Sequence, residues 1–313
     1  MKKRKVFSGQ VNHVFQRTRN SGLVFYAVAD YLVFFTVFCS QARKNGIQVL
    51  ALCPMPDHVH QVVTARSGVQ LSAFEKGYAR LFAWEWNRSR GRKGALFHHR
   101  FDSACKRGDK QVRTTLARNN NKPVERKLSK KAEEYRWTFL AYYGNTHPFS
   151  PELNLSRARS YVRSVIREIR ECHDAGGYLR YRQLGRWERH LSAQEWLQVT
   201  DAIISLWNVI DFEAACAYYG NYEAMLQAFH EYTGSEDDLR EERDNCSDTV
   251  YADCLRVLQA EGLVESPFSI PTLPDGRKET CFRLLLERTS ARPGQIAKFL
   301  HLESGPYAKT ALP

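Results

Sequence analysis

The chain of 313 residues lacks closely spaced cysteines. Its eight cysteines are scattered, and no two of them form a Cys-x-x-Cys pair. A zinc knuckle or ribbon needs closely paired ligands, and a disulfide framework is typical of small secreted chains, so neither scaffold is expected. The cysteines are predicted to be reduced thiols that are mostly buried.

Long apolar runs and repeats are also missing. The basic start MKKRKVFSGQ is followed by no long apolar core, and the apolar run over 31–39 covers only nine residues. A helix that spans a bilayer needs about 20 apolar residues. We interpret this run as the buried face of a helix, and we expect a cytoplasmic protein that does not contact a membrane. The chain contains no internal repeat and no low-complexity tract.

Acidic residues are scarce in the first part of the chain. Residues 1–140 contain 27 Lys and Arg against 9 Asp and Glu, whereas the remainder contains 19 basic and 25 acidic residues. Positive charge that is confined to one part of a chain indicates a module that binds a polyanion. The alternative is a basic domain that is merely soluble.

Hydrophobic periodicity predicts an α+β unit followed by a helical region. The chain is expected to form three domains, over 1–148, 149–245 and 246–313. In the first, we expect strands and helices in the following order: strand 11–18, helix 26–44 closed by Asn45-Gly46, strand 47–53 ending before Pro54, strand 58–64, helix 71–87, a strand near 96–104, and helix 110–121 ending before Pro123. Helices over 156–173, 192–206 and 212–232 follow, and the acidic stretch 234–248 is predicted to be a linker.

Two histidines begin one of these strands. In the stretch over 47–63, alternation sends His58 and His60 to one face and Val59 to the other. Two imidazoles about 7 Å apart along a strand can converge on one divalent ion. Magnesium and manganese prefer oxygen ligands, so Mg²⁺ or Mn²⁺ is expected only with a phosphate completing its shell.

The sequence around these histidines resembles the signature of the REP-associated tyrosine transposases, which are relatives of single-strand insertion-sequence transposases. The resemblance covers residues 10–145, and four stretches agree with it in order and spacing: CPMPDHVHQVV (53–63), KGYARLF (76–82), LFHHRFDS (96–103), and PVERKL (123–128) with EYRW (134–137). It implies a ferredoxin-like HUH domain with an antiparallel sheet, and single-stranded or hairpin DNA as the partner of a monomer or homodimer.

The resemblance also implies a reaction. The histidine pair would hold a divalent cation on a scissile DNA phosphate, and a tyrosine of the third helix would attack that phosphate to form a phosphotyrosine link. The expected nucleophile position is Arg118, and the expected third-ligand position is Lys122. An arginine stays protonated and is not a nucleophile. Other residues are candidates by type only: Asn119, Asn120 and Asn121 as oxygen ligands, and Tyr78, Tyr135, Tyr142 and Tyr143 as nucleophiles.

Basic side chains cluster next to the expected site. Phe97 and Trp86 are available nearby for base stacking. The predicted phosphate contacts are Arg88, Arg90, Arg92, Lys93, Arg100, Lys106, Arg107 and Lys110.

Two later segments also match parts of known modules. Residues 207–211 and 218–225 resemble the helical extension of longer members of the same family. Residues 290–300 resemble the second helix of a helix-turn-helix, with His301 at the expected turn glycine. The recognition helix would fall at 303–313, where a Gly-Pro pair breaks the pattern, so the motif is predicted to be partial.

Three functions are compatible with these observations. The first is a transposase that cleaves and rejoins single-stranded DNA as part of a mobile element. The second is an inactive remnant that still binds DNA, and the loss of tyrosine at Arg118 favours it over the first. The third is a metal-dependent phosphodiesterase without a covalent intermediate, whose general base would be Asp57.

Overall fold

The computed structural model describes residues 7–98, 101–232 and 247–302. Its first part is an α+β unit with a four-stranded sheet in the order β2-β3-β1-β4, and every pairing is antiparallel. This is the strand order of a split βαβ, ferredoxin-like fold, and it confirms the predicted antiparallel sheet. The elements are β1 (Val11–Arg17), α1 (Val28–Asn45), β2 (Gln48–Met55), β3 (His58–Thr64), α2 (Gly68–Ser89), β4 (Asp102–Lys106) and α3 (Gly108–Glu125).

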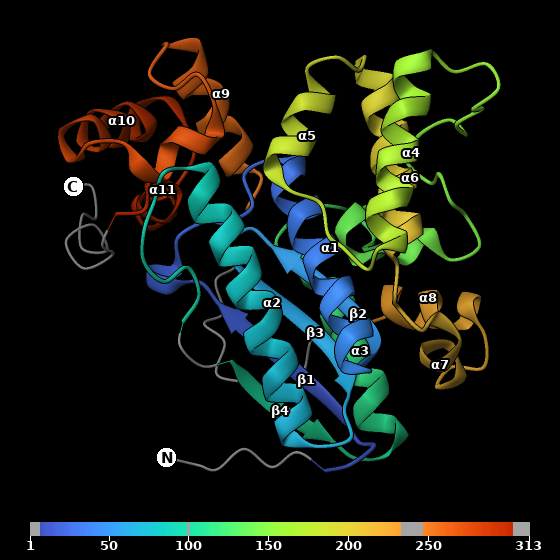
Figure 1. The fold of residues 1–313 in the computed structure, drawn as a ribbon. Helices are drawn as coiled ribbons and strands as arrows, with labels where there is room; N and C mark the ends of the chain where they lie inside the picture. Colours follow the sequence, from blue (N-terminus) through green and yellow to red (C-terminus); the bar gives the residue numbers. More distant parts are fainter. Residues whose placement is uncertain (1–6, 99–100, 233–246, 303–313) are drawn as a thin grey trace.

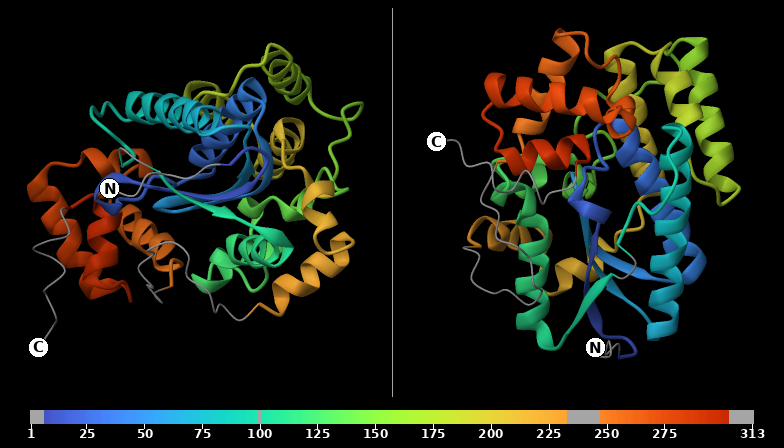
Figure 2. Two further views of the ribbon diagram at one scale, coloured as in Figure 1. Left: turned by 90° about the horizontal axis from the view of Figure 1, so that it is seen from below. Right: turned by 90° about the vertical axis from the view of Figure 1, so that its left-hand side faces the viewer.

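Helices cover both faces of the sheet. Helices α1 and α2 lie on one face and α3 lies on the other (Figures 1 and 2). The alternation of β3 supplies both layers, because Val59 and Val63 join the core under α1 and α2 while Val62 joins the core under α3. The residues on the α3 side of β3 therefore include His58 and His60.

Two prolines do not end their elements as predicted. Strand β2 continues through Pro54 to Met55, where Pro54 is paired with Val59. Because β2 is an edge strand, the missing amide of Pro54 costs no ladder bond to a further strand. Helix α3 likewise continues through Pro123 to Glu125. Pro123 falls in the last turn, where its missing amide removes only one helical hydrogen bond.

The other boundaries follow the sequence more closely. Helix α1 ends at Gly46, whose left-handed backbone (φ 61°, ψ 41°) forms the predicted cap. Strand β4 begins only at Asp102, later than predicted, and before it Phe97 makes a single bridge to Thr18. The predicted helix over 212–232 is two helices, because Gly220 turns the chain with φ 96°.

The rest of the described chain is helical, as predicted, and contains no strand after β4. Most of the predicted linker over 234–248, and all of 303–313, lie outside the described residues. The helices are α4 (Ser160–Asp174), α5 (Tyr181–Glu188), α6 (Ala193–Trp207), α7 (Phe212–Ala217), α8 (Tyr222–His230), α9 (Val250–Ala260), α10 (Asp275–Arg288) and α11 (Pro293–Leu300).

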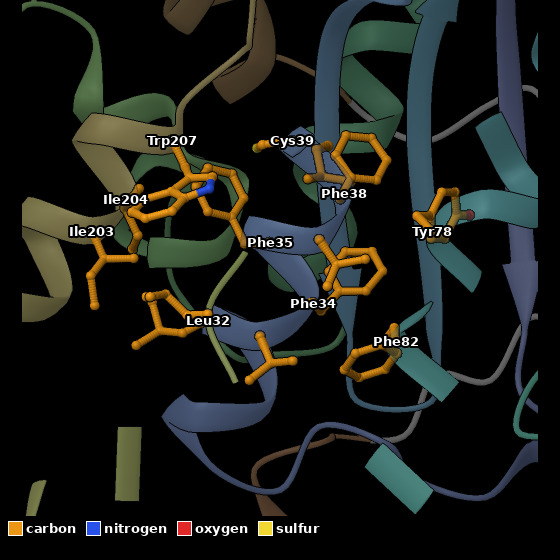
Figure 3. Packing of buried hydrophobic residues seen from close by; sticks show 14 of the residues in the cluster. Leu32, Phe34, Phe35, Phe38, Cys39, Tyr78, Phe82, Ile203, Ile204 and Trp207 are labelled. Carbon is orange, nitrogen blue, oxygen red and sulfur yellow. The ribbon is translucent and has the colours of Figure 1, made fainter. Parts of the chain in front are cut away.

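Helix α1 is buried on two sides. Phe34 packs against the α2 rings Tyr78 and Phe82, with ring centroids 5.8 and 5.3 Å away. On its other side, α1 meets Ile203 and Trp207 of α6 in the same hydrophobic core (Figure 3). Helices α4 to α6 therefore share one core with the sheet, whereas α7 and α8 pack with α3.

Helices α9 to α11 form a separate core that also includes Leu23 from the segment between β1 and α1. No helix among the described residues is long and apolar enough to cross a membrane.

Candidate nucleic-acid site

The histidine pair lies on the α3 face of the sheet, as alternation predicts. His58 is paired with Arg17 and His60 with Phe15 across the β1–β3 ladder. The two imidazole centroids are 4.8 Å apart and the rings are nearly perpendicular, at 86°. The structure thus brings the two predicted metal ligands together.

His60 stands inside a column of stacked rings. It stacks on Phe15 at 4.6 Å and on His13 at 5.5 Å, and its Nδ1 lies 3.3 Å from Nε2 of His13. Burial, together with the nearby His58 and the charge of Lys122, holds the pKa of His60 well below its usual value. His60 is therefore neutral at physiological pH. Sequence analysis missed His13, although it shares the alternation of β1 with Phe15.

His58 is held by its neighbour Asp57. The Nδ1 atom of His58 donates to Oδ1 of Asp57 at 2.5 Å, and the other carboxylate oxygen is 3.4 Å from Nζ of Lys298 on α11. Burial acts to raise the pKa of Asp57, but its interaction and hydrogen bond with His58 and the charge of Lys298 together lower it well below its usual value. Both oxygens of this carboxylate already accept from His58 and Lys298, so it is poorly placed to act as a general base, which counts against the phosphodiesterase alternative.

Helix α3 presents two cations to this face. Arg118 and Lys122 are buried, and both contribute to the lowered pKa of His60. Lys122 also pairs with Glu125 at 3.0 Å. The two positions that the family resemblance assigns to the nucleophile and the third ligand thus lie across from the histidines, and both are basic.

The three asparagines of α3 differ in their partners. Asn120 donates to the carbonyl of Leu116. Asn121 donates to the carbonyls of Ala117 and Phe229, toward α8. Both atoms of the Asn119 carboxamide are buried without a hydrogen bond to the described residues. The Oδ1 atom of Asn120 is likewise buried without a hydrogen bond to the described residues, so the oxygens of Asn119 and Asn120 are both still available as ligands.

The candidate tyrosines are used in packing. Tyr78 lies on the opposite face of the sheet and donates to Glu75 at 2.7 Å. Tyr135 donates to the carbonyl of Pro54, and Tyr142 donates to Asp201. Burial raises the pKa of all three well above the usual value. Tyr143 is 42% exposed and stacks on Tyr222. None of the three buried phenols is activated for attack on a phosphate.

The donor set at the histidines does not by itself fit a magnesium or manganese ion. The described residues contain no group of three His, Cys, Asp or Glu that could hold a metal. Hard divalent cations require oxygen ligands, and the position expected to supply one carries the ammonium of Lys122. A cation bound here would depend on DNA phosphate for most of its oxygen ligands, and the metal site stays a prediction.

The predicted phosphate contacts do not form one cluster. Helix α2 and the histidines lie on opposite faces of the sheet, so the arginines at the end of α2 are separated from the site. Four of these side chains are exposed: Arg88, Lys93, Arg107 and Lys110. Arg92 is half-buried and donates to Asn87, Lys106 is buried, and Arg100 lies outside the described residues.

Arg90, a predicted phosphate contact, lies in the core. Its side chain is fully buried and its Nη2 lies 2.6 Å from Oδ1 of Asp30. Because this ion pair lies at the start of α1, on the face of the sheet opposite the histidines, Arg90 does not reach a phosphate at the candidate site. The predicted stacking rings Trp86 and Phe97 are buried as well, whereas Trp84, which the sequence did not single out, is 47% exposed with Arg88 above its ring.

No protein-family model matches the chain, and no curated protein matches it. Two chains of solved structures match. One is a REP-associated tyrosine transposase bound to a REP hairpin, with a TM-score of 0.37 and 15% identity, over 44% of this chain and 80% of that chain. The protein is thus a distant structural neighbour of that transposase, and a likeness this weak carries no conclusion about its activity.

Proposed function

We propose that this protein binds single-stranded or hairpin DNA on the α3 face of its N-terminal sheet and does not cleave it. The observation that carries the proposal is the pair Arg118 and Lys122 across from His60. Imidazole, guanidinium and ammonium groups all bind phosphate oxygens, whereas neither cation replaces a tyrosine as nucleophile. The 27 basic residues against 9 acidic ones in residues 1–140 supply the field that attracts a nucleic acid.

The absence of a covalent step can be tested by trapping. The full-length protein is incubated with radiolabelled hairpin DNA and Mn²⁺, and a denaturing gel separates any protein–DNA adduct. Binding without an adduct is expected, because the hydroxyls of the candidates Tyr78, Tyr135 and Tyr142 are buried and hydrogen-bonded within the core. An adduct formed by the unmodified protein would refute the proposal, and peptide mapping would identify its nucleophile.

A variant that restores the missing nucleophile should give a covalent adduct in the same assay. Arg118→Tyr with Lys122→Asn places a phenol and an oxygen ligand one helical turn apart on the face of α3 that meets the histidines. We expect this double variant to form a detectable adduct in Mn²⁺, and we expect His60→Ala in that background to abolish it. Lys122→Asn alone is the matched control, and it should form none.

A second candidate retains a divalent ion on His58 and His60. The 4.8 Å separation of their rings favours it, because two imidazoles so close can share one ligand. It predicts that hairpin binding weakens when EDTA removes Mg²⁺ at constant ionic strength. Hairpin binding that is unchanged by EDTA would exclude the divalent ion and leave only direct contact between the side chains and the phosphates.

A further inference from the structure

The C-terminal helices reach the candidate site through one side chain. Lys298 lies on α11, 241 positions from Asp57 in the sequence, and its Nζ is 3.4 Å from Oδ2 of Asp57. The other oxygen of the same carboxylate accepts from Nδ1 of His58 at 2.5 Å. Ammonium, carboxylate and imidazole thus form a continuous chain that ends at the predicted ligand His58.

Helix α11 is fixed at the position from which Lys298 makes this contact. The amide of Leu23 donates to the carbonyl of Lys298 at 3.2 Å, and the hydroxyl of Tyr26 donates to that of Phe299 at 2.6 Å. His301 closes α11 in a left-handed conformation and donates from Nε2 to the carbonyl of Leu23 at 2.6 Å. Its ring lies so close to Gly22 that a Cβ there would stand 2.8 Å from the ring.

The ion pair between Asp57 and Lys298 is largely shielded from water. The side chains of Asp57 and Lys298 are 13% and 22% exposed, so water screens their interaction less than at an open surface. A carboxylate that accepts from Nδ1 fixes the imidazole as the Nδ1–H tautomer and leaves Nε2 as an acceptor or ligand atom. Without Lys298, Oδ2 of Asp57 loses its ammonium partner, and water takes the place of the ammonium. The carboxylate is then less firmly oriented toward Nδ1 of His58.

We propose that Lys298 is a positioning residue of the DNA site, which acts through Asp57 to fix the ring of His58. The C-terminal helices would then supply part of a site whose other groups come from β1, β3 and α3. This inference rests on the proposed DNA binding, which it extends to a region that carries none of the predicted site residues.

The test uses the full-length protein and two measurements. Hairpin affinity is measured for Lys298→Met, and the ring nitrogen shifts of His58 are measured in the DNA-free protein labelled with ¹⁵N-histidine. We expect Lys298→Met to lower the affinity roughly tenfold, as loss of a partner behind a ligand does, and to shift the His58 signals toward a mixture of tautomers. Lys298→Arg should restore both. Arg256→Met, which removes an exposed cation of the same helical region, is the matched control and should change neither.

The background variant Asp57→Asn separates positioning from direct contact. If Lys298 acts through Asp57, Lys298→Met should add no further loss of affinity to Asp57→Asn. An equal further loss would show that Lys298 contacts DNA directly, and it would overturn the inference. Unchanged His58 signals in Lys298→Met would overturn it as well. If those signals shift as expected while no variant or parent binds the hairpin, the proposed function fails and the positioning role stands.

Discussion

Replacing Arg90 with Met tests whether this arginine belongs to the core or to the DNA surface. Its guanidinium donates to Asp30 at 2.6 Å with both side chains fully buried, and it donates to Ser89 at 2.8 Å. It also lies over the rings of Trp86 at 4.1 Å and Phe268 at 4.6 Å. The contacts join the end of α2 to the start of α1 and to the segment before α10.

The expected loss follows from what remains around Asp30. Its carboxylate keeps the hydroxyl of Tyr181 at 2.7 Å and the amides of Tyr26 and Ala27 at 2.9 and 3.1 Å, but it loses its cation. Removing one partner of a buried ion pair lowers the free energy of unfolding by about 3 to 5 kcal/mol. Adding Asp30→Asn to Arg90→Met should recover part of this loss, because the unpaired charge is then gone.

Urea unfolding followed by tryptophan fluorescence measures this effect, and the matched control is Arg88→Met on the same helix. Arg88 is exposed, so its replacement should change the free energy of unfolding by less than about 0.5 kcal/mol. A loss below about 1 kcal/mol for Arg90→Met would refute the buried-pair argument, since an exposed pair contributes at most about that much. Equal losses for the two variants would refute it too.

Two further predictions concern pH and salt. Burial, only partly offset by the hydrogen bond to Leu23, lowers the pKa of His301 to about 4, so its neutral form contributes stability that is fully present above pH 6.5 and is lost as the pH falls toward 4. The loss should be on the order of 3 kcal/mol, and His301→Asn, which tolerates the left-handed backbone, should flatten the pH dependence of the urea midpoint; parallel curves for both proteins would contradict this. Reversing the exposed cations Arg107 and Lys110 at the start of α3 to Glu should weaken hairpin binding for all sequences alike and reduce the salt slope by roughly one per lost phosphate contact. A slope that stays the same would exclude them from the DNA surface.

Local patterns predicted the sheet and the histidine pair. Alternation along residues 58–64 fixes which side chains share a face, and neighbouring strands cannot change that without exposing Val59 and Val63. The cap at Gly46 was predictable for the same reason, because only the local backbone is involved. The effect of the prolines was not predictable in this way. A strand tolerates a proline only where no neighbouring strand needs the missing amide, as Pro54 on an edge strand shows.

Whether a basic side chain is buried or exposed depends on partners that are distant in the sequence. Arg90 stands in a stretch of alternating Arg, Ser and Gly that is typical of an exposed turn, and nothing within it indicates burial. Its burial is set by Asp30, 60 positions earlier, and by Tyr181 on α5. Lys298 is a similar case, because its contact with Asp57 is visible only once α11 is docked against the turn between β2 and β3. Charge counts predicted a basic region, but they could not separate phosphate contacts from ion pairs of the core.

The shared core changes how the candidate site should be studied. Phe35 of α1 belongs to the same hydrophobic core as Ile203 and Trp207 of α6, so a fragment that ends near residue 148 exposes a face that is buried in the whole chain. Such a fragment would also lose Lys298, and with it a cationic partner of Asp57. Weak DNA binding by the fragment would then follow from a disturbed core and a missing side chain alike. The full-length chain with single substitutions separates these causes, because each changes one contact and leaves the core of α1 intact.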